Sequence, residues 1–372
     1  MKIGFDAKRA YNNVAGLGNF SRRTIVALAR QYPNDCYFLF NPAEKKPLFT
    51  APENSTEIKP EGFWNAFPNA WRSYQITSKA KELNLEIYHG LSHELPIGIE
   101  KTGIKSIVTI HDLIYLRYPQ YFQKIDRSIY DLKFRHSCRV ATRIHAISEQ
   151  TKQDLISFLN VPEEKIDVIY QAINTLFFQV CTEEQKLTVL DKYQLPTQFL
   201  LNVGTIEPRK NLVGLLNGML LANLKIPLVV VGKPTHYIRE VQQLIEKHQS
   251  DLKVYFLPGI EDVDLQALYQ SAVAMIYPSV FEGFGLPVVE AQASGCPVIT
   301  SNISSLPEAG GEAALYIHPL NAEEIGQAIR KLMDETDLRE SLIAKAKVNA
   351  QRFTANIYAR QLKQLYNSIL ND

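Results

Sequence analysis

Short runs of apolar residues alternate along the chain with longer segments in which apolar positions recur every three or four residues. A short apolar run is typical of a buried strand, and the longer period is typical of a helix that covers a sheet. This alternation predicts an α/β fold of parallel sheets wrapped by helices. The expected strands are 2–6, 36–40, 86–89, 106–110 and 143–147 in the first half, and 199–203, 228–231, 254–257, 274–277, 298–300 and 314–317 in the second half.

The strand rhythm lapses between residues 171 and 196, where a charged, helix-prone segment takes its place. At 372 residues the chain also exceeds the usual size of one hydrophobic core, so two domains are expected. We predict an N-terminal domain over residues 1–175 and a C-terminal domain over residues 176–354. A final helical segment, 355–372, has no strand after it and must bury its apolar face on a neighbour, for which the first domain is a candidate.

The composition is that of an ordinary globular protein, with 46% hydrophobic residues, 21% charged residues and a net charge of +1. This balance gives the whole molecule no bias toward nucleic acid. The longest apolar stretch, 212–231, is interrupted by polar residues, and the chain starts with a strand pattern rather than a cleavable signal, so a cytoplasmic protein is expected. Four scattered cysteines lack the spacing of zinc or redox motifs and suit reduced thiols: Cys36, Cys138, Cys181 and Cys296.

Two glutamates eight positions apart, Glu282 and Glu290, flank a glycine-rich turn between strand 274–277 and a helix whose start is marked by Pro287. Backbone amides at a helix start lack intrahelical partners and, with the helix dipole, favour an anion such as a diphosphate. A carboxylate beside them accepts hydrogen bonds from hydroxyl groups, which fits a ribose or a hexose. A helix cap with a solvated glutamate is the simpler alternative for either glutamate alone, but the whole motif favours a seat for a sugar nucleotide, with amides from Gly283, Phe284, Gly285 and Leu286.

Gly204 opens a second loop, which carries Arg209 and Lys210 from the end of strand 199–203 to the helix that follows. Ligands of open α/β sheets bind at the carboxyl ends of the strands, where an arginine fork and a lysine can hold a diphosphate. Alone, these cations would more often be surface charge. They oppose the helix dipole, however, and so need a compensating anion, which the glycine-rich seat in the same domain is expected to bind.

In the first domain, Gly16 and Gly18 precede the first predicted helix but match the dinucleotide fingerprint poorly. Ser21 stands at the position of the third glycine, and about ten residues separate the turn from the strand. The fingerprint requires the turn to follow the strand directly. A loop that faces a phosphate or sugar and a plain helix cap remain equally open. His111 follows strand 106–110 at a carboxyl edge and is a candidate polar contact for a substrate.

No metal site is expected. Asp262 and Asp264 form an Asp-x-Asp pair like that of some metal-dependent sugar-transferring enzymes, but helix capping explains them more simply. His89 and His93 have the spacing of a helical metal pair, whereas Gly90 between them argues against a helix.

Segments 64–83 and 127–143 mix basic and aromatic residues. Such segments could lie on an anionic membrane surface, although helices packed on a sheet with solvated cations are the simpler interpretation.

Taken together, these motifs resemble the retaining glycosyltransferases of family 4. The resemblance is strongest over residues 204–311, and its specific elements are Glu-Pro-Arg-Lys-Asn at 207–211 and the paired-glutamate segment 282–290. It implies the GT-B architecture, in which two facing Rossmann-like domains with parallel sheets enclose a cleft. It also implies that 355–372 crosses back to the first domain and that the enzyme needs no metal or other cofactor.

The resemblance implies a role for each motif. Arg209 and Lys210 would bind the donor diphosphate, and Glu290 would hold the donor ribose. Glu282 would contact the transferred sugar, helped by the amides of 283–286, and His111 matches a family histidine that contacts the donor sugar. The other positions that it assigns to donor binding are Gly16, Gly18, Gly204 and Ile260, the last of these beside the base.

The implied reaction transfers a hexosyl group from a nucleoside diphosphate sugar to a hydroxyl group with retention of configuration. Segments 88–92 and 109–115 look most like mannosyltransferase-type members, so GDP-mannose is the expected donor. The expected acceptor is a glycan or lipid-linked saccharide of a bacterial surface polysaccharide such as lipopolysaccharide, which would place the enzyme in the cytoplasm or at the inner face of the membrane. A GT-B sugar-nucleotide epimerase or hydrolase, a non-catalytic nucleotide-sugar-binding protein and an NAD-dependent dehydrogenase remain as alternatives.

Overall fold

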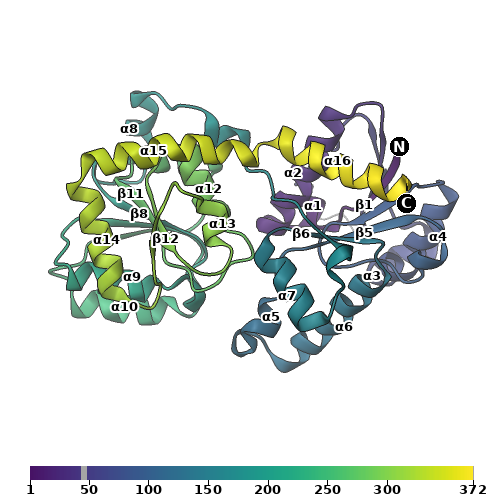
Figure 1. The fold of residues 1–372 in the computed structure, drawn as a ribbon, viewed down its shortest axis with the longest axis horizontal. Helices are drawn as coiled ribbons and strands as arrows, with labels where there is room; N and C mark the ends of the chain where they lie inside the picture. Colours follow the sequence, from purple (N-terminus) through teal and green to yellow (C-terminus); the bar gives the residue numbers. More distant parts are fainter. Residues whose placement is uncertain (43–47, 372) are drawn as a thin grey trace. The chain divides into compact units, whose positions relative to one another are not determined.

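The computed structural model describes residues 1–42 and 48–371 and contains two compact units, each a parallel sheet covered by helices (Figure 1). Unit 1 comprises Met1–Ala172 together with Ala355–Asp372, and unit 2 comprises Ile173–Thr354. The division after Ala172 lies close to the expected end of the first domain at residue 175. Among the described residues, no helix is both long enough and apolar enough to span a bilayer.

Unit 1 is built on a seven-stranded sheet in the order β3-β2-β1-β4-β5-β6-β7, in which each described strand pair is parallel. Its strands are β1 Lys2–Asp6, β2 Cys36–Phe40, β3 Ser55–Ile58, β4 Ile87–Gly90, β5 Lys105–Ile110, β6 Arg143–Ala146 and β7 Ile166–Val168. The apolar runs predict five of these to within one residue because a strand covered on both faces is apolar throughout. The two edge strands β3 and β7 were not expected.

Unit 2 contains a six-stranded parallel sheet in the order β10-β9-β8-β11-β12-β13. Its strands are β8 Leu200–Val203, β9 Leu228–Val231, β10 Val254–Leu257, β11 Ala274–Tyr277, β12 Val298–Ser301 and β13 Leu315–Ile317. All six confirm the sequence prediction to within one residue.

The strand order of unit 2 reverses between β8 and β11, which are neighbours in the sheet. The chain leaves β8 toward β9 on one side and later returns to β11 on the other. The loops that follow β8 and β11 therefore emerge side by side at the carboxyl edge. In open α/β sheets this reversal is where ligands bind.

Helices cover both sheets. Those of unit 1 are α1 Lys8–Asn12, α2 Gly16–Gln31, α3 Pro68–Ala70, α4 Ile76–Glu82, α5 Ile114–Arg117, α6 Lys124–Val140, α7 Glu149–Leu159 and α16 Ala355–Asn371. Those of unit 2 are α8 Glu183–Lys192, α9 Leu212–Leu221, α10 Ile238–Lys247, α11 Asp262–Ser271, α12 Leu286–Ala293, α13 Leu306–Gly310, α14 Ala322–Asp334 and α15 Thr336–Ala350.

Helix α16 lies against α2 in unit 1 (Figure 1). Tyr358, Leu362, Tyr366 and Ile369 recur at helical spacing and are buried in the same core as α2 and the central strands. The last helical segment of the chain is thus part of the unit that the first residues form.

Candidate active site

The loop after β8 brings Arg209 and Lys210 to the carboxyl edge of the unit 2 sheet. It starts at Gly204, continues through a short 3-10 helix, Pro208–Lys210, and enters α9. Gly204 has a φ of +142°, and its carbonyl oxygen would lie 1.8 Å from a Cβ at Gly232, the first residue after β9. Two neighbouring strand ends can approach this closely only because Gly232 has no side chain.

The loop after β11 is joined to the first by main-chain contacts. The amide of Val280 donates a hydrogen bond to the carbonyl of Arg209 at 2.8 Å, and the hydroxyl of Ser279 approaches the same carbonyl at 3.2 Å. Asn211, in a left-handed conformation with a φ of +57°, separates the 3-10 helix from α9. The side chains of Arg209 and Lys210 are therefore positioned by both loops.

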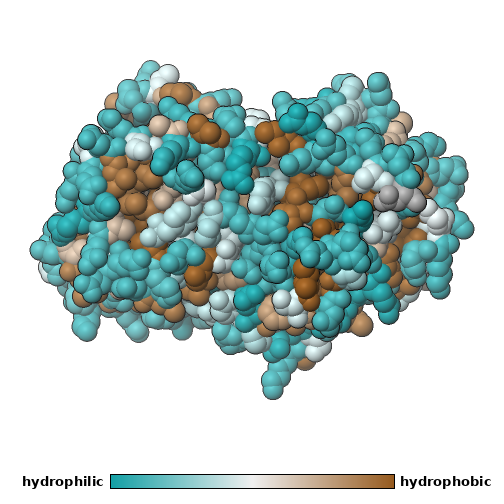
Figure 2. Space-filling view, in the orientation of Figure 1, coloured by the Kyte–Doolittle hydropathy of each residue, from teal (hydrophilic) through white to brown (hydrophobic). Residues whose placement is uncertain are grey.

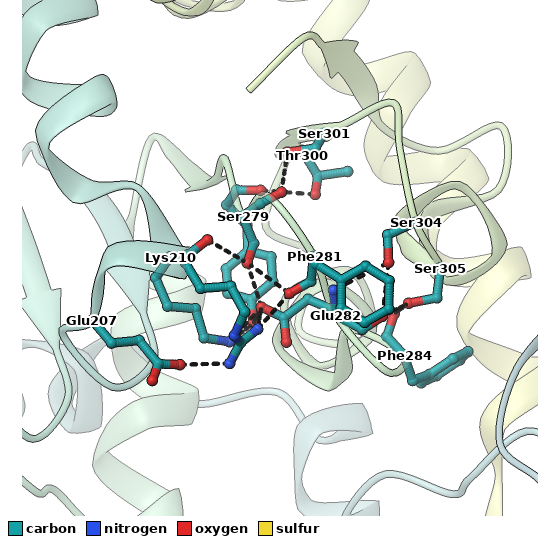
Figure 3. A network of polar contacts seen from close by, with 12 residues as sticks. Glu207, Lys210, Ser279, Phe281, Glu282, Phe284, Thr300, Ser301, Ser304 and Ser305 are labelled. Atoms are coloured by element: carbon teal, nitrogen blue, oxygen red, sulfur yellow. Dashed lines mark hydrogen bonds and ion pairs between the residues drawn. The ribbon is translucent and has the colours of Figure 1, made fainter. Parts of the chain in front are cut away.

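Four side chains converge on the carboxylate of Glu282 (Figure 3). Lys210 Nζ lies 2.5 Å from Glu282 Oε1, and Arg209 Nη1 lies 2.8 Å from the same oxygen. Ser279 Oγ donates a hydrogen bond to Glu282 Oε1 at 2.5 Å, and the Tyr277 hydroxyl donates to the same oxygen at 3.0 Å. The sequence predicts Arg209, Lys210 and Glu282 to share one site, and the structure brings the three into direct contact.

The Glu282 carboxylate is ionised at physiological pH. Burial alone would raise its pKa, but the charges of Lys210 and Arg209, with hydrogen bonds from Lys210 and Ser279, lower the pKa to about 2. Burial lowers the pKa of Lys210, although the Glu282 carboxylate opposes this shift. Arg209 also donates to Glu207 at 2.5 Å, so the two cations of the cluster are balanced by two carboxylates.

Serines that sequence reasoning missed hold the main chain around Glu282. Ser304 Oγ accepts from the Glu282 amide at 3.1 Å, and Ser305 Oγ lies 2.9 Å from the Glu282 carbonyl and 2.8 Å from that of Phe284. Ser301 Oγ donates to the Ser279 carbonyl at 2.7 Å. Their signal in the sequence is a serine-rich run that begins with the last residue of the buried strand β12 (Figure 3).

Gly285 forms the N-cap of α12 in a left-handed conformation, with a φ of +112° and no side-chain cap. A Cβ there would lie 2.7 Å from Leu306 Cδ2, so both space and backbone conformation select glycine. Glu290 is buried on α12, and its charge contributes, after burial, to the raised pKa of the Tyr269 hydroxyl. The predicted strand, glycine turn and helix are confirmed, with Leu286 rather than Pro287 as the first helical residue.

His111 lies in unit 1, directly after β5. It is buried, its ring meets that of Phe20 edge to face at 4.5 Å, and its Nε2 donates to the Leu91 carbonyl at 3.0 Å. Burial lowers the pKa of His111 to about 4, against the effect of that hydrogen bond. The imidazole is therefore neutral at pH 7, with Nδ1 as its hydrogen-bond acceptor.

Gly16 and Gly18 do not form a loop before the first helix, contrary to one of the two interpretations. The short helix α1 precedes them, and both lie in the first turn of α2. A Cβ at Gly18 would lie 1.8 Å from the Asn13 carbonyl oxygen, whereas one at Gly16 would have open space around it. Gly18 is thus explained by close packing of the chain segment between the two helices.

Asp262 and Asp264 do not cap α11, because Glu261 occupies the N-cap without a side-chain hydrogen bond. Asp264 instead accepts from Lys192 at 2.7 Å and from Tyr193 at 2.6 Å. Ile260 follows β10 in the loop before α11 and is half-buried.

His89 lies on β4, and His93 lies in the turn after this strand. The expectation that the two histidines share no helix is therefore confirmed. His89 is bonded to Tyr366 and Thr109 inside the core, whereas His93 accepts from the amide of His111.

Comparison with known proteins matches both halves of the chain. Residues 191–349 match the family described as glycosyl transferases group 1, and residues 16–176 match the family described as glycosyltransferase family 4. The O-antigen chain mannosyltransferase B of Escherichia coli is 30% identical over 372 residues, covering 95% of this chain and 96% of that protein. The O-antigen chain mannosyltransferase RfbU of Salmonella typhimurium is 29% identical over 240 residues, covering 64% of this chain and 63% of that protein.

A solved glycosyltransferase structure from Rickettsia africae ESF-5 superposes with a TM-score of 0.74 at 19% identity, covering 100% of this chain and 99% of that one. This likeness concerns the fold, in which two parallel-sheet units follow one another along the chain. Because both halves match and one relative aligns over nearly its whole length at 30% identity, the chain belongs to the retaining glycosyltransferases of family 4 and has the GT-B fold.

Proposed function

We propose that this glycosyltransferase moves a mannosyl group from GDP-mannose to a hydroxyl group of a lipid-linked saccharide or growing glycan. The observation that carries the proposal is the buried contact of Arg209 and Lys210 with Glu282 at the strand-order reversal of unit 2. The choice of mannose is supported by the two relatives named as O-antigen chain mannosyltransferases. Their names also support a surface polysaccharide as the product.

The cations suit the charge that develops during transfer. When the bond between the anomeric carbon and the diphosphate oxygen breaks, its electron pair goes to the diphosphate, and positive charge grows on the sugar ring. Arg209 and Lys210 would stabilise the diphosphate, and each such preorganised donor contributes on the order of 3 kcal/mol. The Glu282 carboxylate would lie beside the positive sugar ring.

The new bond forms between the anomeric carbon and the acceptor oxygen on the face that the diphosphate leaves, which retains the configuration. The acceptor hydroxyl gives its proton to the departing diphosphate, so a protein nucleophile is not required. His111, neutral because of its burial, would contact the donor sugar through a hydrogen bond without adding charge.

A product assay tests the proposal. Purified protein is incubated with GDP-mannose, UDP-glucose or UDP-galactose and a lipid-linked saccharide acceptor, and the products are resolved by mass spectrometry and NMR. We expect GDP release, acceptor mannosylation and an α-linked product from the α-linked donor. Free mannose or an epimerised donor in the absence of acceptor would favour the hydrolase or epimerase, and donor binding without turnover on several acceptors would favour a non-catalytic binding protein.

Lys210→Ala tests the site itself. Removing this buried cation deprives the diphosphate of one of its two proposed cationic partners, and we expect GDP affinity to fall by at least about tenfold. Isothermal titration calorimetry measures the affinity, and Lys225→Ala, at an exposed cation of the same unit, is the control. Unchanged GDP affinity in Lys210→Ala would remove the diphosphate role.

Metal-independent transfer is part of the proposal, because Arg209 and Lys210 provide the charge that a divalent cation provides in other transferases. Activity should be the same with EDTA and with added Mg²⁺ or Mn²⁺. A loss of activity in EDTA that added metal restores would contradict this part of the proposal and leave the transferase assignment intact.

A further inference from the structure

Helix α6, Lys124–Val140, has apolar side chains on two opposite faces. Phe134 and Cys138 are buried in the unit 1 core, while Ile125, Ile129 and Leu132 are 74%, 46% and 73% exposed. Spacings of four and three residues place these three side chains in one stripe along the outer face. Single apolar side chains reach the surface at several places (Figure 2), which is ordinary, but a continuous stripe on a helix is not.

Cations border this stripe. Helix α6 carries five lysine or arginine residues against two aspartates, and within this set Arg135 pairs with Asp131 and Lys133 with Glu94. Two hollows adjoin it: one of about 450 Å³, whose lining includes Lys124, Arg127 and Arg135, and one of about 540 Å³, whose lining includes Lys133, Arg135 and Arg139. An exposed apolar stripe between clustered cations is the pattern of a helix that lies in the plane of an anionic membrane surface.

The other basic and aromatic segment, 64–83, exposes Phe67 and Tyr74 by 49% and 59%, but its central groups are used internally. Trp71 and Arg72 are buried, and the Arg72 guanidinium donates to Asp6 and Glu94. The simpler interpretation of that segment, helices packed on a sheet, therefore holds for its central residues. The stripe of three exposed aliphatic side chains at helical spacing distinguishes α6 from it.

We propose that the outer face of α6 binds an anionic lipid bilayer. Ile125, Ile129 and Leu132 would enter the boundary between headgroups and acyl chains, while the exposed cations Lys124 and Arg139 reach the lipid phosphates. Charge complementarity selects this occupant over a second copy of the chain, because two copies would bring like-charged helices together. The inference extends the proposed action on a lipid-linked acceptor, and it is tested without donor or acceptor.

Vesicle flotation tests the inference with the intact protein. We expect binding to vesicles of phosphatidylethanolamine and phosphatidylglycerol, and at least about tenfold weaker binding to phosphatidylcholine alone or in 0.5 M NaCl. The combined variant Ile125→Ser, Ile129→Ser and Leu132→Ser should lower binding to the anionic vesicles by at least about tenfold. Lys124→Glu with Arg139→Glu should lower it similarly without changing the apolar stripe.

In the matched control, serine replaces three exposed apolar residues of unit 2. These are Leu221, Leu320 and Val348, whose exposed fractions are 67%, 71% and 74%. This control should bind vesicles like the wild type. Equal binding of the stripe variant and the wild type, or equal binding to anionic and neutral vesicles, would overturn the inference. Analytical sedimentation gives a further contrary outcome: a wild-type dimer that becomes a monomer in the stripe variant but not in the control variant would also overturn the inference. Transfer to a soluble acceptor, measured in parallel, should persist in the stripe variant and separates failure of this inference from failure of the transferase proposal.

Discussion

Glu282 holds the two cations that a diphosphate would need. Arg209 and Lys210 are within 2.8 Å and 2.5 Å of one oxygen of this buried carboxylate. Buried cations without such a partner would be strongly destabilising. A bound diphosphate would share or replace this internal counter-ion, so under the proposed function the carboxylate would affect both the affinity for the nucleotide and the contact with the sugar.

Replacing Glu282 with Gln separates these two effects. The amide keeps a hydrogen-bond acceptor but loses the charge, so GDP should bind at least as tightly as in the wild type. Turnover should fall by on the order of 10²-fold, because the positive sugar ring loses a preorganised carboxylate. Calorimetry measures the first quantity and steady-state kinetics the second, with Glu323→Gln, at an exposed glutamate, as the control. An equal loss of GDP affinity and turnover would mean that Glu282 has only a structural part.

At the residue scale, the sequence predicts which residues meet but not how they pair. Arg209 and Glu282 were expected in one site because parallel strands end at one sheet edge. Their ion pair was not expected, since both had been assigned to substrate. Ser304 and Ser305 were missed because their contacts with Glu282 depend on β12 lying beside β11, a long-range pairing that local sequence does not determine.

Between elements, one chain of hydrogen bonds crosses the unit 1 sheet. It runs from Tyr366 on α16 through His89 on β4 and Thr109 on β5 to His145 on β6, at 2.7, 2.8 and 3.1 Å. His145 Nε2 must donate to the Ile169 carbonyl, 2.8 Å away, so its Nδ1 accepts from Thr109. Thr109 then accepts from His89 Nε2, and His89 Nδ1 accepts from the Tyr366 hydroxyl. All the donors are thereby assigned.

Tyr366→Phe removes the first donor of this chain and leaves His89 Nδ1 as a buried acceptor without its partner. We expect the free energy of unfolding to fall by roughly 1–3 kcal/mol, the cost of one unsatisfied buried group. Urea unfolding monitored by circular dichroism measures the change. Tyr74→Phe, at a 59% exposed tyrosine, should leave stability unchanged, and equal stability of the wild type and Tyr366→Phe would show that the hydrogen bond contributes nothing.

The same chain predicts acid sensitivity. Burial lowers the pKa of His145 to about 4, and burial with the nearby His145 and His111 lowers that of His89 well below its ordinary value of 6.5. Between pH 6.5 and 4 the unfolded chain binds protons that the folded chain does not, so stability should decrease as the pH falls. Each histidine contributes up to about 1.4 kcal/mol per pH unit. Urea unfolding at pH 7.5 and 5.0 measures this slope, which should be smaller in His145→Gln; an unchanged slope would contradict the assignment.

The elements that the sequence failed to predict share a physical cause. Strands β3 and β7 lie at the two edges of the unit 1 sheet, where residues are half exposed and no apolar run is needed. Helix α1 has only five residues, too few to show a helical period. The buried central strands were predicted because a strand buried on both faces consists of consecutive apolar residues, which are visible in the sequence.

At the scale of the whole molecule, unit 1 is built from two distant parts of the chain. Leu362 and Ile369 of α16 are fully buried in the core that α2 and the central strands form. The C-terminal segment is therefore part of the packing of unit 1, although residues 173–354 of unit 2 intervene.

Leu362→Ala should destabilise unit 1 selectively. The cavity left by a fully buried leucine costs about 2–5 kcal/mol, while the proposed nucleotide site of unit 2 is built from other residues. Calorimetric scans should show a lowered transition for unit 1, and a saturating nucleotide should still raise the transition of unit 2 by mass action. Leu221→Ala, at a 67% exposed leucine, is the control. Loss of nucleotide stabilisation in Leu362→Ala would show that the two units do not respond independently.

The position of α16 also sets the order in which the protein matures during synthesis. Domains usually fold in the order in which the ribosome makes them. Here the first unit lacks the helix that covers α2 until residues 355–371 have been translated, whereas unit 2 has all its residues once Thr354 is made. The residues of unit 2 are thus complete first, and the apolar side chains of unit 1 that α16 covers lack this cover until the last helix has been made.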